Sequence, residues 1–328
     1  MPLLSSERMH VACGADERYV PHLAVMLQSL CQHASLPVEV HVMDGGLPEP
    51  ARAYLRRVVE GQFGQQLSFL ALDAQRLNHL RLTTWFSAAN YYRILLPELL
   101  PDLQRVLYLD ADIAIADDLA PLWRTPFADF ELAAVVNVLH PKNPPGHVFD
   151  LGLKQASDYF NSGVLLMDLA HMRANGTTQR LLAFAGSHPE LMLYADQDAL
   201  NGVFAGRWQR LHPRWNVQTT MLEVAPDRQP LIPAELADAL GKPAVIHYMG
   251  SWKPWRLWSN HPLRGVYRQH YQRLPRPVHR VRKNLPAVLE YYFPGWVLAF
   301  YWRWRLRLAA VKRRIKTFVA GFPSRSPL

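Results

Sequence analysis

Short apolar runs alternate with segments of helical periodicity through the first 140 residues, and this alternation limits the fold more than any other feature of the chain. The apolar runs predict strands at 9–14, 38–43, 67–72, 105–109, 131–138 and 164–169, and the spacing of apolar residues predicts helices at 19–33, 48–60 and 88–96. This β-α-β order predicts the α/β class, with a single, mostly parallel, doubly wound sheet. Ligands of such sheets bind beyond the carboxyl ends of the strands, so the functional residues are expected there.

Two acidic residues, Asp110 and Asp112, stand directly after the apolar run 105–109. Side chains two positions apart point to the same side of an extended backbone, and carboxylates this close repel each other unless a cation lies between them. A divalent ion can join such a pair to the oxygens of a diphosphate. The motif by itself leaves two other interpretations open. It could be a solvated strand end, or the nucleophile of a haloacid-dehalogenase-type enzyme, although the later Lys and acidic pair of that class are not found here.

The charge of the chain is distributed unevenly. Residues 276–328 contain 12 Lys or Arg and one acid, so they carry +11 and the first 275 residues carry −2. The same segment has a block of aromatic residues between 291 and 304. Aromatic and basic side chains together favour an anionic lipid interface over nucleic acid or a merely solvated terminus.

The N-terminus and the cysteines indicate where in the cell the protein is located. The first ten residues lack the apolar core of a secretory signal, and no apolar run reaches the ~20 residues that cross a bilayer. Cys13 and Cys31 do not make a disulfide framework. We therefore expect a cytoplasmic protein that sits peripherally on the inner face of the cytoplasmic membrane.

Five further motifs lie in order along the first 255 residues. They are GADERY at 14–19, YYR at 91–93, FNSGVLLMD at 160–168, YADQDALNG at 194–202 and HYMGSWKPW at 247–255. With the acidic pair, they resemble the motifs of the retaining glycosyltransferases of family 8, and most of all the bacterial α-galactosyltransferases and α-glucosyltransferases that build lipopolysaccharide or lipooligosaccharide cores. The resemblance implies a GT-A-type fold and a transfer of galactose or glucose from a UDP-sugar to a sugar acceptor such as a lipid-linked core oligosaccharide.

The resemblance also implies roles for individual residues. Asp16 would accept the uracil N3–H, Tyr19 would stack on the base, and Lys253 would clamp a phosphate. The residues expected to contact the donor are Ala15, Asp16, Tyr19, Arg93, Asp110, Ala111, Asp112, Asn161, Gly250 and Lys253. His247 matches the third protein ligand of a metal held by Asp110 and Asp112, with Mn²⁺ as the expected ion and Mg²⁺ as the alternative.

Two catalytic residues are implied in the same way. Asp196 matches a residue that binds hydroxyls of the transferred sugar, and Gln197 matches the residue beneath the anomeric carbon. Because Gln197 is an amide and no strong nucleophile is evident, front-side attack is expected, with a covalent intermediate on Asp196 as the alternative. Asn137 departs from the Asp that relatives often have in the sugar pocket.

The organisation expected from these observations has two parts. Residues 1–275 form the glycosyltransferase domain, and residues 276–328 form a basic, aromatic, helical tail for peripheral attachment to an anionic membrane. The expected partners are a UDP-sugar and a lipid-linked acceptor, without nucleic acid. Two alternatives stay open: a non-catalytic basic protein that binds membrane or nucleic acid, and a sugar-nucleotide hydrolase.

Overall fold

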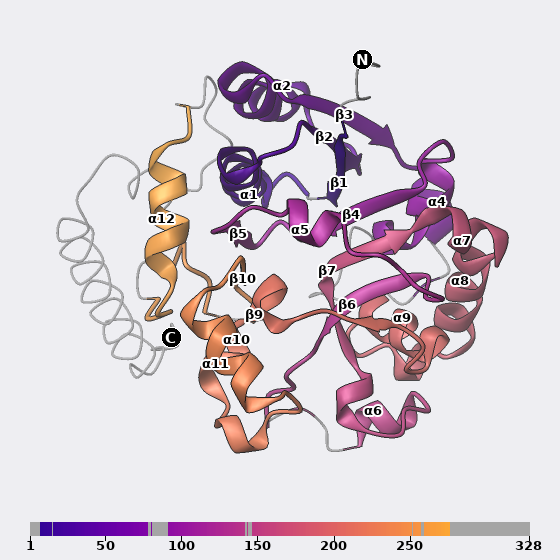
Figure 1. Ribbon diagram of the computed structural model, residues 1–328. Helices are drawn as coiled ribbons and strands as arrows, with labels where there is room; N and C mark the ends of the chain where they lie inside the picture. Colours follow the sequence, from indigo (N-terminus) through magenta and orange to yellow (C-terminus); the bar gives the residue numbers. More distant parts are fainter. Residues whose placement is uncertain are drawn as a thin grey trace, which may run out of the picture.

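The structure is a computed structural model that describes residues 7–14, 16–77, 80, 91–141, 143, 146–250, 252–256 and 259–275. Within these residues, the centre of the molecule is a seven-stranded sheet with the strand order β3-β2-β1-β4-β7-β6-β8 (Figure 1). Its strands are β1 (Met9–Gly14), β2 (Val38–Asp44), β3 (Gln66–Ala71), β4 (Arg105–Leu109), β6 (Leu132–Val136), β7 (Phe160–Asp168) and β8 (Gln209–Arg210). All of them run in one direction except β7, which is antiparallel to its neighbours β4 and β6.

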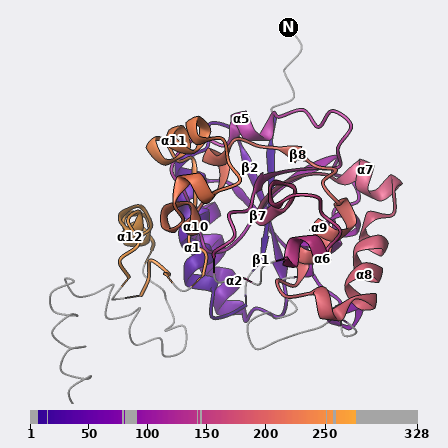
Figure 2. The ribbon, with the colours of Figure 1, turned by 90° about the horizontal axis from the view of Figure 1, so that it is seen from below.

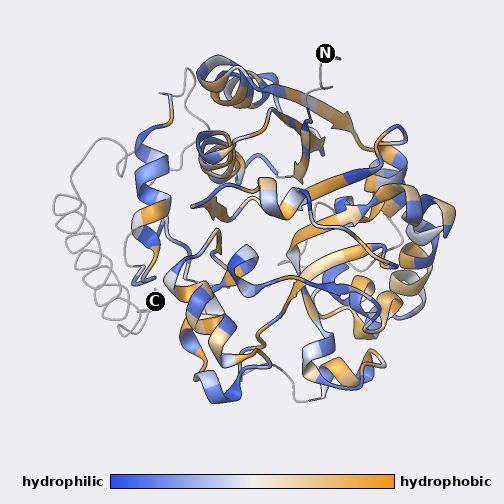
Figure 3. Ribbon diagram, viewed as in Figure 1, coloured by the Kyte–Doolittle hydropathy of each residue, from blue (hydrophilic) through white to orange (hydrophobic). Residues whose placement is uncertain are grey.

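Helices cover both faces of this sheet (Figure 2). Successive side chains of a strand point to opposite faces, so Leu107 and Leu109 of β4 pack on one side and Val106 and Tyr108 on the other. The first side is covered by α1 (Val20–His33), α2 (Glu49–Arg56) and α5 (Ala120–Trp123), and the second by α4 (Leu96–Leu99), α7 (Leu169–Ala174), α8 (Thr177–Ser187) and α9 (Asp196–Phe204). The strands between them are mostly apolar, as the colours of Figure 3 show.

A second, three-stranded sheet lies beside α1. Its strands, in the order β5-β10-β9, are β5 (Ile113–Ile115), β10 (Val245–His247) and β9 (Val217–Gln218). The backbone N–H of Ile115 donates to the hydroxyl of Ser29 in α1 at 2.9 Å, which fixes this sheet against the helix. The remaining α-helices of the described residues are α6 (His147–Asp150), α10 (Thr219–Glu223), α11 (Pro233–Gly241) and α12 (Arg264–Gln272). Helix α12, mostly hydrophilic in Figure 3, packs on α1.

The predicted α/β class with a doubly wound, mostly parallel sheet is confirmed. The three-stranded sheet was not predicted, because strands of two or three residues give almost no periodic signal.

The segment 226–243 has few apolar runs and four prolines, yet it contains α11, whose first residue is Pro233. Proline is well suited to the first turn of a helix, where its missing N–H costs nothing.

The reversed direction of β7 has a consequence for function. Because β7 is antiparallel, its first residues lie at the same edge of the sheet as the last residues of β4 and β6.

Among the described residues no helix is long and apolar enough to cross a membrane. The predicted tail 276–328 and the predicted donor contact Ala15 lie outside the described residues.

Candidate active site

Polar side chains gather at the edge of the sheet where β4 and β6 end and β7 begins. Asp110 directly follows β4, Asn137 directly follows β6, and Asn161 is the second residue of β7. The main chain joins the two sides of this group, since the N–H of Asp110 donates to the carbonyl of Gly163 at 2.9 Å. The site therefore forms at the carboxyl edge that the fold class predicts.

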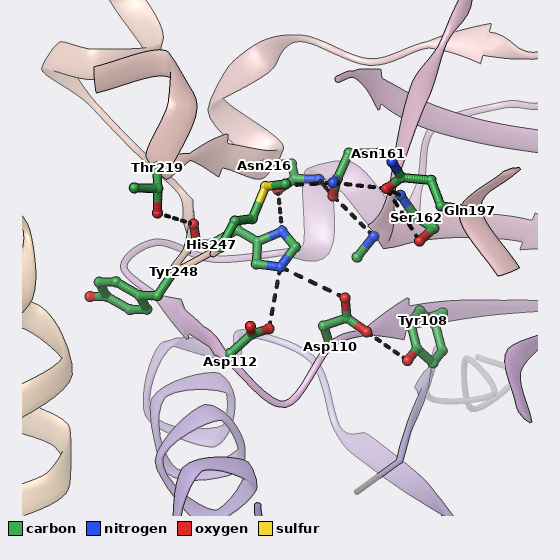
Figure 4. A network of polar contacts seen from close by, with 12 residues as sticks. Tyr108, Asp110, Asp112, Asn161, Ser162, Gln197, Asn216, Thr219, His247 and Tyr248 are labelled. Carbon is green, nitrogen blue, oxygen red and sulfur yellow. Dashed lines mark hydrogen bonds and ion pairs between the residues drawn. The ribbon is translucent and has the colours of Figure 1, made fainter. Parts of the chain in front are cut away.

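Three ligand atoms converge at this edge. The Nε2 atom of His247 lies 3.2 Å from Oδ1 of Asp112 and 3.7 Å from Oδ2 of Asp110 (Figure 4), and all three lie within 4.8 Å of one another. The pairing of β10 with β5 causes this, because it sets His247 opposite Ile113, the residue after Asp112. Two carboxylates and one imidazole make a mixed oxygen and nitrogen set that fits a divalent ion such as Mn²⁺.

Asn216 orients the ring of His247. Its Oδ1 atom lies 3.1 Å from Nδ1 of His247, and its Nδ2 atom donates to Oδ1 of Asn161 at 2.8 Å. Because an amide oxygen can only accept, Nδ1 of His247 carries the proton and Nε2 turns its lone pair towards the carboxylates. This is the tautomer that a metal-binding histidine needs.

Asp112 is held ionised by its neighbours. The Nζ atom of Lys253 contacts Oδ2 of Asp112 and also donates to the carbonyl of Tyr248 at 2.6 Å. Burial disfavours the charged form of Asp112, but the ammonium group of Lys253 outweighs it, so the pKa of this carboxyl lies well below its usual value. The site therefore presents a carboxylate and an ammonium group side by side at neutral pH.

The backbone of β7 approaches the side chains of Asp110 and His247 at Gly163. A Cβ atom at this position would lie 2.7 Å from Oδ2 of Asp110 and 2.8 Å from Nδ1 of His247, far inside ordinary contact distance. Only glycine allows both side chains to keep their places.

Arg93 is buried between two carboxylates. Its Nη2 atom lies 2.9 Å from Oδ1 of Asp110, and its Nε atom lies 2.9 Å from Oδ2 of Asp196. The guanidinium carbon stands 4.2 Å from the ring centroid of Tyr108. Burial opposes the charge of Arg93, but Asp110 and Asp196 outweigh it and raise the pKa of the guanidinium above its ordinary value. A permanent positive charge thus lies between the carboxylates of Asp110 and Asp196.

Asp196 stands at a strained start of α9. The preceding residue, Ala195, has φ 52° and ψ −120°, a backbone conformation that residues other than glycine rarely adopt. Burial raises the pKa of the Asp196 carboxyl to about 7, with Arg93 opposing this shift and Asp110 adding to it. Backbone strain of this kind costs about 1–3 kcal/mol and is often found at functional sites.

Gln197 is fixed by hydrogen bonds on both ends of its amide. Its Oε1 atom accepts from Nδ2 of Asn161 at 3.1 Å and from the N–H of Ser162 at 3.0 Å, and its Nε2 atom donates to the hydroxyl of Tyr159 at 2.9 Å. The same hydroxyl donates to Oδ1 of Asp198 at 2.6 Å. Figure 4 shows the side of this network that faces the metal-ligating residues.

Asn137 belongs to the same wall of the site. It is 3% exposed, and its Oδ1 atom accepts from Nδ2 of Asn161 at 3.0 Å. Its N–H donates to the carbonyl of Tyr159 at 2.8 Å. This position is therefore filled by a neutral amide that supports Asn161.

The residues predicted to bind the base lie together at the end of β1. Asp16 accepts from Nη2 of Arg18 at 2.7 Å and from the N–H groups of Arg18 and Tyr19 at 2.9 and 3.2 Å. The ring of Tyr19 stands edge-on to Trp255, with centroids 6.0 Å apart. Because the Arg18 side chain is 83% exposed, it is free to leave one oxygen of Asp16 to a ligand. Gly250 has φ 65° and is exposed, so its N–H is accessible beside Lys253.

The structure thus brings together the predicted residues that it describes, and it adds four that the sequence analysis missed. They are Tyr108, Tyr159, Asp198 and Asn216. Tyr108 donates to Oδ1 of Asp110 at 2.8 Å, and its position two residues before Asp110 on a strand was a signal that could have found it. Nothing in the sequence around Asn216 marks its role, because its partners are distant along the chain.

Comparisons with known proteins agree with one another. A family model described as glycosyl transferase family 8 matches residues 10–259. General stress protein A of Bacillus subtilis (strain 168) is 32% identical over 269 residues, covering 80% of this chain and 92% of that protein. Lipopolysaccharide 1,2-glucosyltransferase of Escherichia coli (strain K12) is 25% identical over 266 residues, covering 80% and 78%. The galactosyltransferase LgtC, crystallised with donor and acceptor sugar analogues, has a TM-score of 0.74 at 27% identity and covers 81% of this chain and 96% of its own.

Proposed function

The chain belongs to glycosyltransferase family 8 and has a GT-A-type α/β fold, and on this basis we propose that it transfers galactose or glucose from a UDP-sugar to a sugar acceptor, with retention at the anomeric carbon. The observation that carries the proposal is the convergence of Asp110, Asp112 and His247 beside Lys253 at the carboxyl edge of the sheet. The glucosyltransferase and the galactosyltransferase among the similar proteins support the choice of hexose.

The proposed metal site and Lys253 act on the leaving group. Asp110, Asp112 and His247 would hold Mn²⁺, or alternatively Mg²⁺, and such an ion stabilises the charge of a departing diphosphate. Lys253 contacts Asp112 and the carbonyl of Tyr248, and donor binding would give its ammonium group a phosphate oxygen as a third partner. Gly250, with its accessible N–H, adds a donor for the same phosphates. Preorganised positive charge of this kind favours the transition state over the ground state.

The sugar would lie against the wall formed by Asp196, Gln197 and Asn161. Gln197 is a neutral amide held at both ends, and Asp196 is paired with Arg93, so neither is a strong nucleophile. We therefore propose front-side attack. The bond from the anomeric carbon to the phosphate oxygen breaks, the acceptor oxygen bonds to that carbon on the same face, and its proton passes to the leaving phosphate. A rapid-quench search for a glycosylated Asp196 peptide tests this step, and a highly occupied adduct would overturn it.

The base would bind at the end of β1. Asp16 has an oxygen for the uracil N3–H, and Tyr19 offers a ring face beside Trp255. Ala15 and Ala111, the neighbours of Asp16 and Asp110, complete the proposed donor contacts.

The proposal also covers the sugar acceptor and the attachment of the protein to a membrane. A lipopolysaccharide or lipooligosaccharide core is proposed because a similar protein is a lipopolysaccharide glucosyltransferase. Residues 1–275 would form the catalytic domain, and residues 276–328, with 12 basic residues and one acid, would attach it to the cytoplasmic face of an anionic membrane. Truncation after Pro275 should abolish binding to anionic liposomes, and unchanged binding would refute attachment through the tail.

A donor screen tests the activity. Isotope-labelled UDP-galactose and UDP-glucose are incubated with the protein and Mn²⁺, with and without core oligosaccharide, and both UDP and glycosylated product are measured. Asp112→Asn should lose Mn²⁺-dependent UDP release. UDP release without glycosylated product, whichever acceptor is present, would indicate a hydrolase. If no donor gives Mn²⁺-dependent UDP release, the proposal is refuted.

A further inference from the structure

A second cluster of metal-ligating side chains lies at the opposite edge of the sheet. His10 is the second residue of β1, and Glu39 and His41 stand in the first half of β2. The parallel register sets His10 directly beside Glu39. All three side chains therefore leave the sheet on one face near the amino ends of its strands, away from the proposed donor site.

The ligand atoms of this cluster are close enough to share an ion. The Nδ1 atom of His10 lies 3.1 Å from Nε2 of His41 and 3.8 Å from Oε2 of Glu39, and the three atoms lie within 4.8 Å of one another. Ligand atoms at about 2.0 Å from a tetrahedral Zn²⁺ are about 3.3 Å apart. The ligand atoms of the two imidazoles already have nearly this separation. A small rotation of the Glu39 side chain would bring its carboxylate oxygen to a similar distance from both.

Ser68 on β3 prepares His41 for this role. The hydroxyl of Ser68 lies 2.9 Å from Nδ1 of His41 and donates to the carbonyl of Val40 at 3.3 Å. Because its own proton points to Val40, the hydroxyl accepts from His41, so Nδ1 is protonated and Nε2 is free to bind. Metal-binding histidines commonly have such a partner on the second nitrogen.

The charge and exposure of the cluster also suit an ion. The His41 ring is buried, whereas the side chains of His10 and Glu39 are 20% and 28% exposed, which leaves a path for an ion and room for water. Arg8 competes for Glu39 at 3.9 Å, but its side chain is 31% exposed and can turn away.

We propose that His10, Glu39 and His41 form a second divalent-metal site, which takes Zn²⁺ with water as the fourth ligand. Two imidazoles and one carboxylate are a common zinc set, and they contain more nitrogen than the set formed by Asp110, Asp112 and His247. The two sites therefore differ in preference, with Zn²⁺ at the amino edge and Mn²⁺ at the carboxyl edge.

Zn²⁺ titration of the full-length protein by calorimetry tests this proposal, with Co²⁺ as a visible probe of tetrahedral nitrogen and oxygen ligands. Wild type should bind one more Zn²⁺ than His41→Gln or His10→Gln, and Ser68→Ala should weaken this site by roughly 10–100-fold. His188→Gln, at a half-buried histidine remote in the sequence, is the matched control and should keep both the stoichiometry and the affinity of wild type.

Equal stoichiometry and affinity in wild type, His10→Gln and His41→Gln would overturn the proposal. Circular dichroism shows whether each variant is folded, and Glu39→Gln provides a third variant with little change of shape. The result does not depend on transferase activity, since the cluster contains no residue of the proposed donor site and Asp112→Asn should retain the extra Zn²⁺.

Discussion

The Nδ1 atom of His247 lies 3.1 Å from the Oδ1 atom of Asn216, and this contact connects the proposed metal ligands to the amide network of Asn216, Asn161 and Gln197. Asn216 passes the connection on by donating to Asn161, which in turn donates to Gln197. All of these side chains except Gln197 are less than 5% exposed, so water does not replace a lost partner easily. A single hydrogen-bond network therefore sets the orientations of both His247 and Gln197.

Replacing Asn216 should weaken the metal site without touching a ligand. Asn216→Leu removes the acceptor for Nδ1 of His247, so the ring can take the wrong tautomer, and the Mn²⁺ concentration needed for half-maximal UDP release should rise roughly 10–100-fold. Asn216→Asp keeps an acceptor for Nδ1 of His247 but loses the donor to Asn161, so its Mn²⁺ dependence should change less than that of Asn216→Leu. An unchanged Mn²⁺ dependence in Asn216→Leu would show that the contact does not orient the ring.

A methyl group at position 163 should displace Asp110 and His247 and so disrupt the proposed metal site. In Gly163→Ala the new Cβ would press on Asp110 and His247, and a displacement of about 1 Å in an active site can lower the rate roughly 100-fold. Gly241→Ala is the control, because a Cβ there meets nothing within 4 Å. Mn²⁺ binding and UDP release are measured for both. Wild-type metal affinity in Gly163→Ala would contradict the close approach.

Backbone strain at Ala195 should be visible in stability. Glycine adopts the φ of 52° freely, whereas Ala199 lies within the regular helix α9 and is equally buried. Both Ala195→Gly and Ala199→Gly remove one buried methyl group, and Ala199→Gly also carries the cost of about 1 kcal/mol for glycine inside a helix. Ala195→Gly should therefore be the more stable variant in urea unfolding by about 1 kcal/mol plus the strain of about 1–3 kcal/mol. A difference of only about 1 kcal/mol would mean that the conformation of Ala195 carries no cost.

The sequence predicted the local features of this molecule better than its long-range contacts. The strand Arg105–Leu109 and the following acidic pair could be read directly, because apolar periodicity and spacing are local properties. The direction of β7 could not, since parallel and antiparallel strands have the same alternation of side chains. The contacts of Asn216 join segments that are distant in the sequence, and the cluster of His10, Glu39 and His41 depends on the pairing of β1 with β2. Such contacts leave no mark on neighbouring residues.

Buried histidines should make the fold sensitive to acid. Burial lowers the pKa of His22 from its ordinary value of 6.5 to about 3, and Lys253 adds to this effect while Asp112 opposes it. The ring also stacks on Trp255 and lies 2.6 Å from the hydroxyl of Tyr267. Above pH 6.5 the ring is neutral in both the folded and the unfolded chain, so this histidine makes no pH-dependent contribution there.

Below pH 6.5 the unfolded chain takes up a proton at His22 that the folded protein does not, so the free energy of unfolding falls until the pH reaches about 3. One such group contributes a slope of about 1.4 kcal/mol per pH unit. His22→Gln cannot titrate, so its free energy of unfolding, measured in urea between pH 6 and 4, should fall less steeply than that of wild type by about this amount. His261→Gln should behave in the same way down to pH 4, because burial lowers the pKa of His261 to about 4. Parallel pH profiles for wild type and both variants would show that these rings are protonated in the folded protein.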